Sequence, residues 1–114
     1  DLHHALGLLL TRKKESAAAL KEFVEAARLA PTNSRYVYVQ AIAVHSAGKR
    51  DEALVILRGA NTRFPGDIDI LGALVSIYGE AGDKENTLRY ARQLAELLPD
   101  NADVKRLIAE LEVR

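Results

Sequence analysis

The chain has three prolines, and they recur at one interval. Pro31, Pro65 and Pro99 are each separated from the next by 34 residues. Proline pushes the residue before it toward an extended conformation, so a helix usually stops there. A fixed period in this range is typical of proteins built from stacked structural repeats. The spacing therefore favours a repetitive scaffold over a fold with one non-repeating core.

Between the prolines the apolar residues follow a helical pattern. They recur at three- and four-residue steps, as in Ala19, Phe23 and Ala26, which is the period of an amphipathic helix. Short connections between such helices indicate antiparallel hairpins. We predict an all-α fold of seven helices, at residues 1–13, 16–30, 34–47, 50–63, 68–81, 84–98 and 102–113.

Residues suited to helix ends stand at the predicted joints. Gly48 and Gly82 follow two of the helices, where glycine adopts a left-handed conformation at little cost. Residues whose side chains can accept hydrogen bonds from the first helical N–H groups precede four helices: Asn33, Asp67, Asp83 and Asn101.

The apolar and small residues also repeat in phase with the prolines. The first unit reads His3-x2-Leu6-Gly7-x2-Leu10, then Ala19-x3-Phe23 and Pro31. The second reads Val37-x2-Gln40-Ala41-x2-Val44, then Ala53-x3-Leu57 and Pro65. The third reads Leu71-x2-Leu74-Val75-x2-Tyr78, then Thr87-x3-Ala91 and Pro99. This arrangement resembles the tetratricopeptide repeat family, whose pattern is Trp-x2-Leu-Gly-x2-Tyr, Ala-x3-Phe and Pro.

The resemblance implies a right-handed α-solenoid of antiparallel helix hairpins. Residues 1–114 would form a single domain with repeats at about 1–33, 34–67 and 68–101, closed by a capping helix at 102–113. The cap would bury an apolar face made of Val104, Leu107, Ile108 and Leu111. Thr87 and Ala91 depart from the family pattern, so we expect looser packing in the third repeat. We also expect the chain to be a piece of a longer protein.

Composition excludes several classes of function. The formal net charge is zero, so no overall field favours nucleic acid or anionic lipid as partners. No apolar run reaches the length that membrane insertion needs. There is no cysteine, which rules out disulfides and thiolate chemistry and leaves the cellular compartment undefined.

The residues offer no catalytic or metal-binding constellation. The three histidines are His3, His4 and His45. His3 stands at an aromatic packing position of the repeat, and His4 and His45 would lie about 10 Å apart along neighbouring helices, too far to share one metal ion. No nucleophile elbow and no phosphate-binding loop is present. We predict a non-enzymatic protein without a cofactor.

In proteins that this chain resembles, the first helices of successive repeats line a concave groove. The corresponding groove residues here are His4, Leu8, Arg12, Arg35, Tyr38, Ile42, His45 and Ser76. Tyr38 and Ile42 are one helical turn apart and therefore share a face. An aromatic and an aliphatic residue with arginines nearby are typical of the centre of a protein interface. We expect a protein or peptide partner, with Tyr38 and Ile42 as anchors.

Two further hypotheses concern the kind of partner. One subfamily grips a C-terminal carboxylate with Lys, Asn and Arg side chains. The corresponding positions here are His4, Leu8, Val39, Asp69 and Ala73, and none of them matches. The alternative to a peptide-binding module is a structural module that docks against its parent chain or self-associates weakly. Val55, predicted to lie on the outer face of its helix, would support such self-association.

Overall fold

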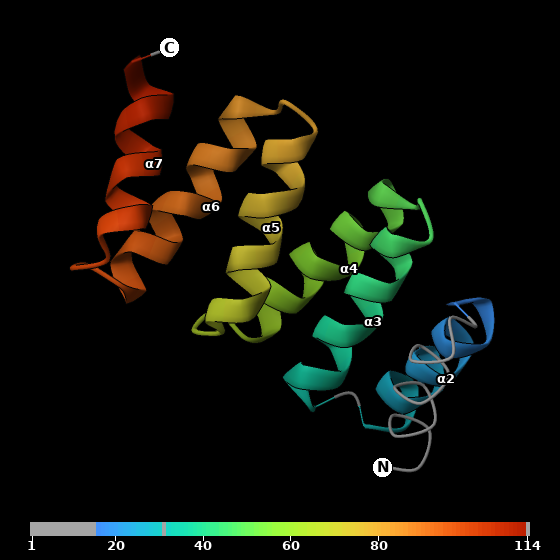
Figure 1. The fold of residues 1–114 in the computed structure, drawn as a ribbon. Coiled ribbons are helices and arrows are strands. Elements are labelled where there is room, and N and C mark those ends of the chain that lie inside the picture. The colour runs from blue at the N-terminus through green and yellow to red at the C-terminus, as the bar shows by residue number, and fades with distance from the viewer. Residues whose placement is uncertain (1–15, 31, 114) are drawn as a thin grey trace. The chain divides into compact units, whose positions relative to one another are not determined.

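The computed structural model describes residues 16–30 and 32–113, and these fold into α-helices without a strand. The elements are α2 (Ser16–Leu29), α3 (Ser34–Ser46), α4 (Arg50–Arg63), α5 (Ile68–Glu80), α6 (Lys84–Leu97) and α7 (Ala102–Val113) (Figure 1). Each predicted helix in this range is confirmed to within one residue. The described part of the chain thus holds six helices rather than seven, and the remaining predicted helix, at 1–13, lies outside the described residues.

The helices begin and end at residues that are suited to helix ends. Each of the four predicted cap residues accepts hydrogen bonds from backbone N–H groups of the next helix at 3.0–3.3 Å: Asn33, Asp67, Asp83 and Asn101. Gly48 and Gly82 end α3 and α5 with φ angles of +83° and +74°, a conformation that side chains with a Cβ rarely adopt. Hydrogen bonds from the Asn86 side chain and backbone lower the pKa of Asp83 below its ordinary value.

The chain divides into two compact units, residues 1–60 and 61–114. In the first unit α2 packs against α3. The buried residues of the first unit combine small and large side chains at helical spacing: Phe23, Ala26, Val37, Ala41, Val44, Ala53 and Leu57. Ala26, Ala41 and Ala53 have no exposed surface, which requires neighbouring atoms close to the helix backbone. All of these residues except Ala26 are positions of the repeat pattern found in the sequence.

The second unit is built on the hairpin of α5 and α6. Ile70, Leu71 and Leu74 of α5 are completely buried. The rings of Tyr78 and Tyr90 stack with their centroids 5.7 Å apart. Such parallel stacking adds to the stabilisation from area burial.

Thr87 of α6 is also buried, and its hydroxyl donates to the Asp83 carbonyl oxygen at 2.6 Å. The threonine that replaces the family's alanine therefore has a hydrogen-bond acceptor in the residue that caps its own helix.

Helix α7 packs against α6, as Figure 1 shows. Leu111 is buried, with 7% of its surface exposed. The other members of the predicted cap face are only half-buried: Val104, Leu107 and Ile108. The predicted cap face is therefore buried at Leu111 and only half-buried at its other three positions. Arg92 and Glu112 approach to 3.8 Å, but both are exposed, and such pairs contribute little.

The unequal burial on α7 yields a test of how the cap is held. We expect Leu111→Ala to lower the free energy of unfolding by about 2–3 kcal/mol, because it removes buried methyl groups and leaves a void. Leu107→Ala is the matched control on the same helix and should cost about 1 kcal/mol or less, since its side chain is half-exposed. Urea unfolding of both variants measures the difference. Equal losses would show that the α6–α7 contact is not centred on Leu111.

Candidate functional site

One surface of α3 carries four of the predicted groove residues, and we call it the α3 face: Arg35, Tyr38, Ile42 and His45. The helix buries Val37, Ala41 and Val44. Tyr38, Ile42 and His45 each follow one of these buried residues, so they lie about 100° further around the helix. They are half-buried, whereas Arg35 is exposed. The α3 face therefore lies beside the buried stripe of the helix, and it is partly accessible to solvent.

The arginine and the tyrosine of the α3 face are in contact. The guanidinium carbon of Arg35 lies 5.3 Å from the centre of the Tyr38 ring, within the range of a cation–π interaction. The two residues are three positions apart and therefore adjacent on the helix surface. The contact therefore places the positive charge of Arg35 next to the aromatic ring of Tyr38.

Ile42 continues this surface in the other direction along the helix. It lies four residues after Tyr38, one turn further on, and His45 follows within the next turn. Together, Tyr38 and Ile42 present an aromatic and a branched aliphatic side chain that are not fully buried by the chain itself. Chemically, this face can contact an apolar side chain and add a polar contact at each end.

The structure brings together only part of the predicted groove. Arg35, Tyr38, Ile42 and His45 share α3, and Ser76 is an exposed residue of α5 in the second unit. His4, Leu8 and Arg12 lie outside the described residues.

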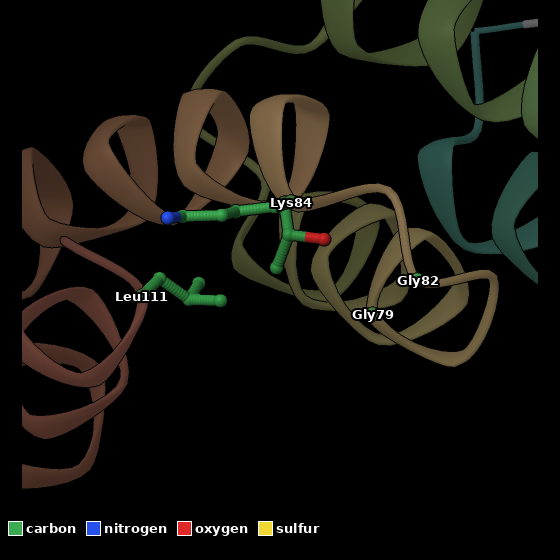
Figure 2. Close-up of a pocket in the computed structure, with 5 residues that line it drawn as sticks. Gly79, Gly82, Lys84 and Leu111 are labelled. Atoms are coloured by element: carbon green, nitrogen blue, oxygen red, sulfur yellow. The ribbon is translucent and has the colours of Figure 1, made fainter. Parts of the chain in front are cut away.

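A cavity that the sequence analysis did not predict lies in the second unit. It has a volume of about 270 Å³ and is lined by Gly79, Gly82, Lys84, Thr87 and Leu111. Figure 2 shows Leu111 on one side of this cavity and the two glycines on the other. The feature of the sequence that could have indicated this cavity is the pair Gly79 and Gly82 near Thr87, which stands at a normally apolar position of the repeat. The residues that line the cavity include no carboxylate, histidine or cysteine, so they provide no acid–base pair.

Residues 16–30 and 32–113 contain neither a metal centre nor a membrane-spanning helix. No group of three or more His, Cys, Asp or Glu side chains in these ranges is placed to hold a metal ion. None of the helices in these ranges is both long and apolar enough to cross a membrane.

Comparison with known proteins identifies the class of this fold. No family model matches the chain. It is 34% identical over 95 residues to the TPR repeat-containing protein PA4299 of Pseudomonas aeruginosa, where TPR denotes the tetratricopeptide repeat. That match covers 82% of this chain and 38% of the relative, so the chain spans well under half of the relative's length.

Solved structures share the helical arrangement. The Yersinia enterocolitica type III secretion chaperone SycD, in complex with a peptide of the translocator YopD, matches 98% of this chain with a TM-score of 0.83 and 12% identity, over 91% of its own length. The first TPR domain of Spaghetti (RPAP3), bound to the HSP90 peptide SRMEEVD, matches the same shares with a TM-score of 0.80 and 12% identity. These likenesses show an all-α helical repeat fold. With the in-phase sequence repeats and the similarity to PA4299, they show that the chain belongs to the tetratricopeptide repeat family, whose members are typically non-catalytic.

Proposed function

We propose that this chain is a non-enzymatic interaction module that binds a peptide segment or helix of a partner protein through the α3 face. Tyr38 and Ile42 would be the apolar anchors, and Arg35 would supply a charged contact beside them. The observation that carries this proposal is the position of the two anchors. They lie one turn apart, outside the buried stripe of α3, and are only half-buried.

Structures with the same fold support a peptide-binding role, but they do not identify the partner of this chain. SycD binds a YopD peptide, and the Spaghetti domain binds an HSP90 peptide, so the shared fold accommodates peptide ligands. His4, Leu8 and Arg12 lie outside the described residues and stay candidates for the binding surface from the sequence pattern alone. Ser76 stays a candidate from the sequence pattern alone.

Recognition of a C-terminal carboxylate is disfavoured by the described residues at the corresponding positions. Val39 is half-buried and Ala73 is buried, and neither carries a charge. Asp69 is exposed on α5, and an Asp side chain supplies no N–H donor for a carboxylate. We therefore propose that side chains inside the partner segment, rather than its terminus, make the principal contacts.

Self-association is a second candidate function, and one observation favours it. Val55 of α4 has 60% of its surface exposed, so it could contact a second copy of the chain. A single exposed valine is common in monomeric proteins, and for this reason we place peptide binding first. Sedimentation of Val55→Ala beside the parent chain separates the two, since only self-association through α4 would weaken on that change.

Replacing both anchors tests the proposed function. Peptides are first selected from a phage-displayed random library on the immobilised chain, and their affinities are then measured by calorimetry. We expect Tyr38→Ala, Ile42→Ala to lose roughly 2–4 kcal/mol of binding free energy, because buried aromatic and aliphatic anchors dominate interfaces. Val55→Ala is the control, since it removes an exposed aliphatic side chain of the same unit.

Two outcomes would contradict the proposal. Unchanged peptide affinity of the double variant would exclude the α3 face as the binding surface. Loss of the folded state, read from its thermal melt, would show that both residues belong to the core and would favour the structural role.

A further inference from the structure

We infer that the cavity of the second unit is a binding site for a small, uncharged aromatic molecule of one ring or two fused rings. The cavity belongs to residues 61–114, whereas the α3 face belongs to residues 1–60. The inference therefore goes beyond the proposed function and does not depend on it. It follows from the volume of the cavity, from the atoms that form its walls and from the helices that meet there.

Two glycines leave the space of the cavity open. Gly79 is the second-to-last residue of α5, and Gly82 lies in the turn between α5 and α6. The φ angle of Gly82 is +74°, a conformation that disfavours any residue with a side chain. Leu111 of α7 is buried and lies on the other side of the cavity (Figure 2). Residues of α5, α6 and α7 thus border a space that their side chains do not fill.

The part of the wall that α6 supplies beside Gly79 is apolar. Thr87 is buried, and its hydroxyl donates to the Asp83 carbonyl oxygen at 2.6 Å. A Cβ atom placed on Gly79 would lie 4.0 Å from Cγ2, the methyl carbon of Thr87. The methyl group of Thr87 therefore faces the space beside Gly79, while its hydroxyl is directed to the backbone. Together with Leu111, this methyl group gives the cavity hydrocarbon walls.

Among the described residues that line the cavity, Lys84 is charged. It is an exposed residue, and Figure 2 shows its side chain extending away from Gly79 and Gly82 toward its terminal nitrogen. A lysine in such a position contributes its alkyl stem to an apolar space while its ammonium group stays at the surface. A ligand in the cavity would therefore contact mainly carbon atoms. Burial against carbon atoms favours an uncharged molecule, because a charged one would lose its hydration.

The volume of the cavity limits the size of the ligand. At about 270 Å³, the cavity exceeds the roughly 150 Å³ that is enough for benzene in an apolar protein interior. It is smaller than the roughly 300 Å³ at which pockets for drug-sized ligands begin. One aromatic ring with a short substituent, or two fused rings, falls between these limits. A rigid ring is favoured over a flexible alkyl chain because it loses less conformational entropy on binding.

The position of the cavity gives ligand binding a consequence for α7. Leu111 is buried, but the other apolar residues of this helix are only half-buried: Val104, Leu107 and Ile108. A molecule in the cavity would contact Leu111 and the α5–α6 hairpin at the same time. It would thus add apolar contact area where α7 is held. Because a ligand that binds only the folded state stabilises that state, we expect the melting temperature to rise with ligand concentration.

The experiment titrates indole, a neutral molecule of two fused rings, into the complete ¹⁵N-labelled chain and follows the amide signals by NMR. We expect the largest shift changes at the residues that line the cavity, and no change at Tyr38 or Ile42. Purine has the same ring skeleton but several polar nitrogens. We expect purine to bind at least tenfold more weakly, because an apolar site does not replace its hydrogen bonds to water.

Substitutions at Gly79 test whether the cavity itself is the site. The described glycines with left-handed φ angles are Gly48 and Gly82, so Gly79 can accept a side chain without backbone strain. A Cβ atom there lies at an ordinary contact distance from Thr87, and larger side chains take up more of the cavity. We expect Gly79→Ala to weaken indole binding about threefold and Gly79→Leu at least tenfold. Both variants should stay folded in a thermal melt, because Ala and Leu favour a helix more than Gly does.

Gly72 provides the matched control on the same helix. It lies in α5, does not line the cavity, and a Cβ atom added to it would meet no other atom within 4 Å. Gly72→Ala and Gly72→Leu make the same changes in helix propensity and should alter the Kd for indole less than twofold. Equal weakening by the Gly72 and Gly79 variants would overturn the inference, since the effect would then not come from the cavity.

Three further outcomes would overturn the inference. These are indole shifts centred away from the cavity or absent altogether, purine binding as tight as that of indole, and indole binding that both Gly79 variants retain in full. Each of them leaves the proposed function standing, because peptide binding through Tyr38 and Ile42 is measured without indole. Conversely, indole that binds in the cavity supports the inference even if the double variant at the α3 face binds peptides normally.

Discussion

The fold depends on close contact between paired helices at small side chains. Ala26, Ala41, Ala53 and Ala91 have no exposed surface, and an alanine can be covered completely only where a neighbouring element lies close to its helix. Larger residues such as Phe23, Leu57 and Leu74 fill the space on either side. Because each helix buries a narrow stripe in this way, stability comes from contacts between neighbouring helices, as in other repeat proteins.

The same constraint leaves part of the α3 surface available for the binding that we propose. Val37, Ala41 and Val44 supply the buried stripe, so Tyr38 and Ile42 are not needed to complete it. They are instead half-buried next to that stripe. A surface of this kind is rigid, because its helix is fixed by packing, yet it keeps apolar area available. Rigid placement reduces the entropy that a binding site loses when a ligand is bound.

Local features of the sequence predicted the helices and their ends well. The prolines, the two left-handed glycines and the four cap residues each act within a few positions of the chain. Non-local burial was harder to predict. Leu111 and Leu107 are both leucines on the apolar face of α7, yet only Leu111 is buried, because burial depends on contacts with other helices that periodicity does not specify.

The sequence alone could place only part of the candidate site, for a related reason. Helix α3 is apolar around most of its circumference, so periodicity alone does not separate Val37 from Tyr38. The family pattern made that separation, and the burial of Val37 agrees with it. The cavity beside Thr87 required the three-dimensional packing of α5, α6 and α7.

The most direct test of the account is the reactivity of the four tyrosines toward tetranitromethane, read by mass spectrometry of peptides from the intact, folded chain. Tyr78 and Tyr90 have 5% and 7% of their surfaces exposed and serve as internal controls that should stay unmodified. We expect Tyr38 to be nitrated in the isolated chain and protected when a selected peptide is bound, while the reactivity of Tyr36 stays unchanged. A Tyr38 as unreactive as Tyr78 in the isolated chain would contradict it, as would a Tyr38 that stays reactive when the peptide is bound.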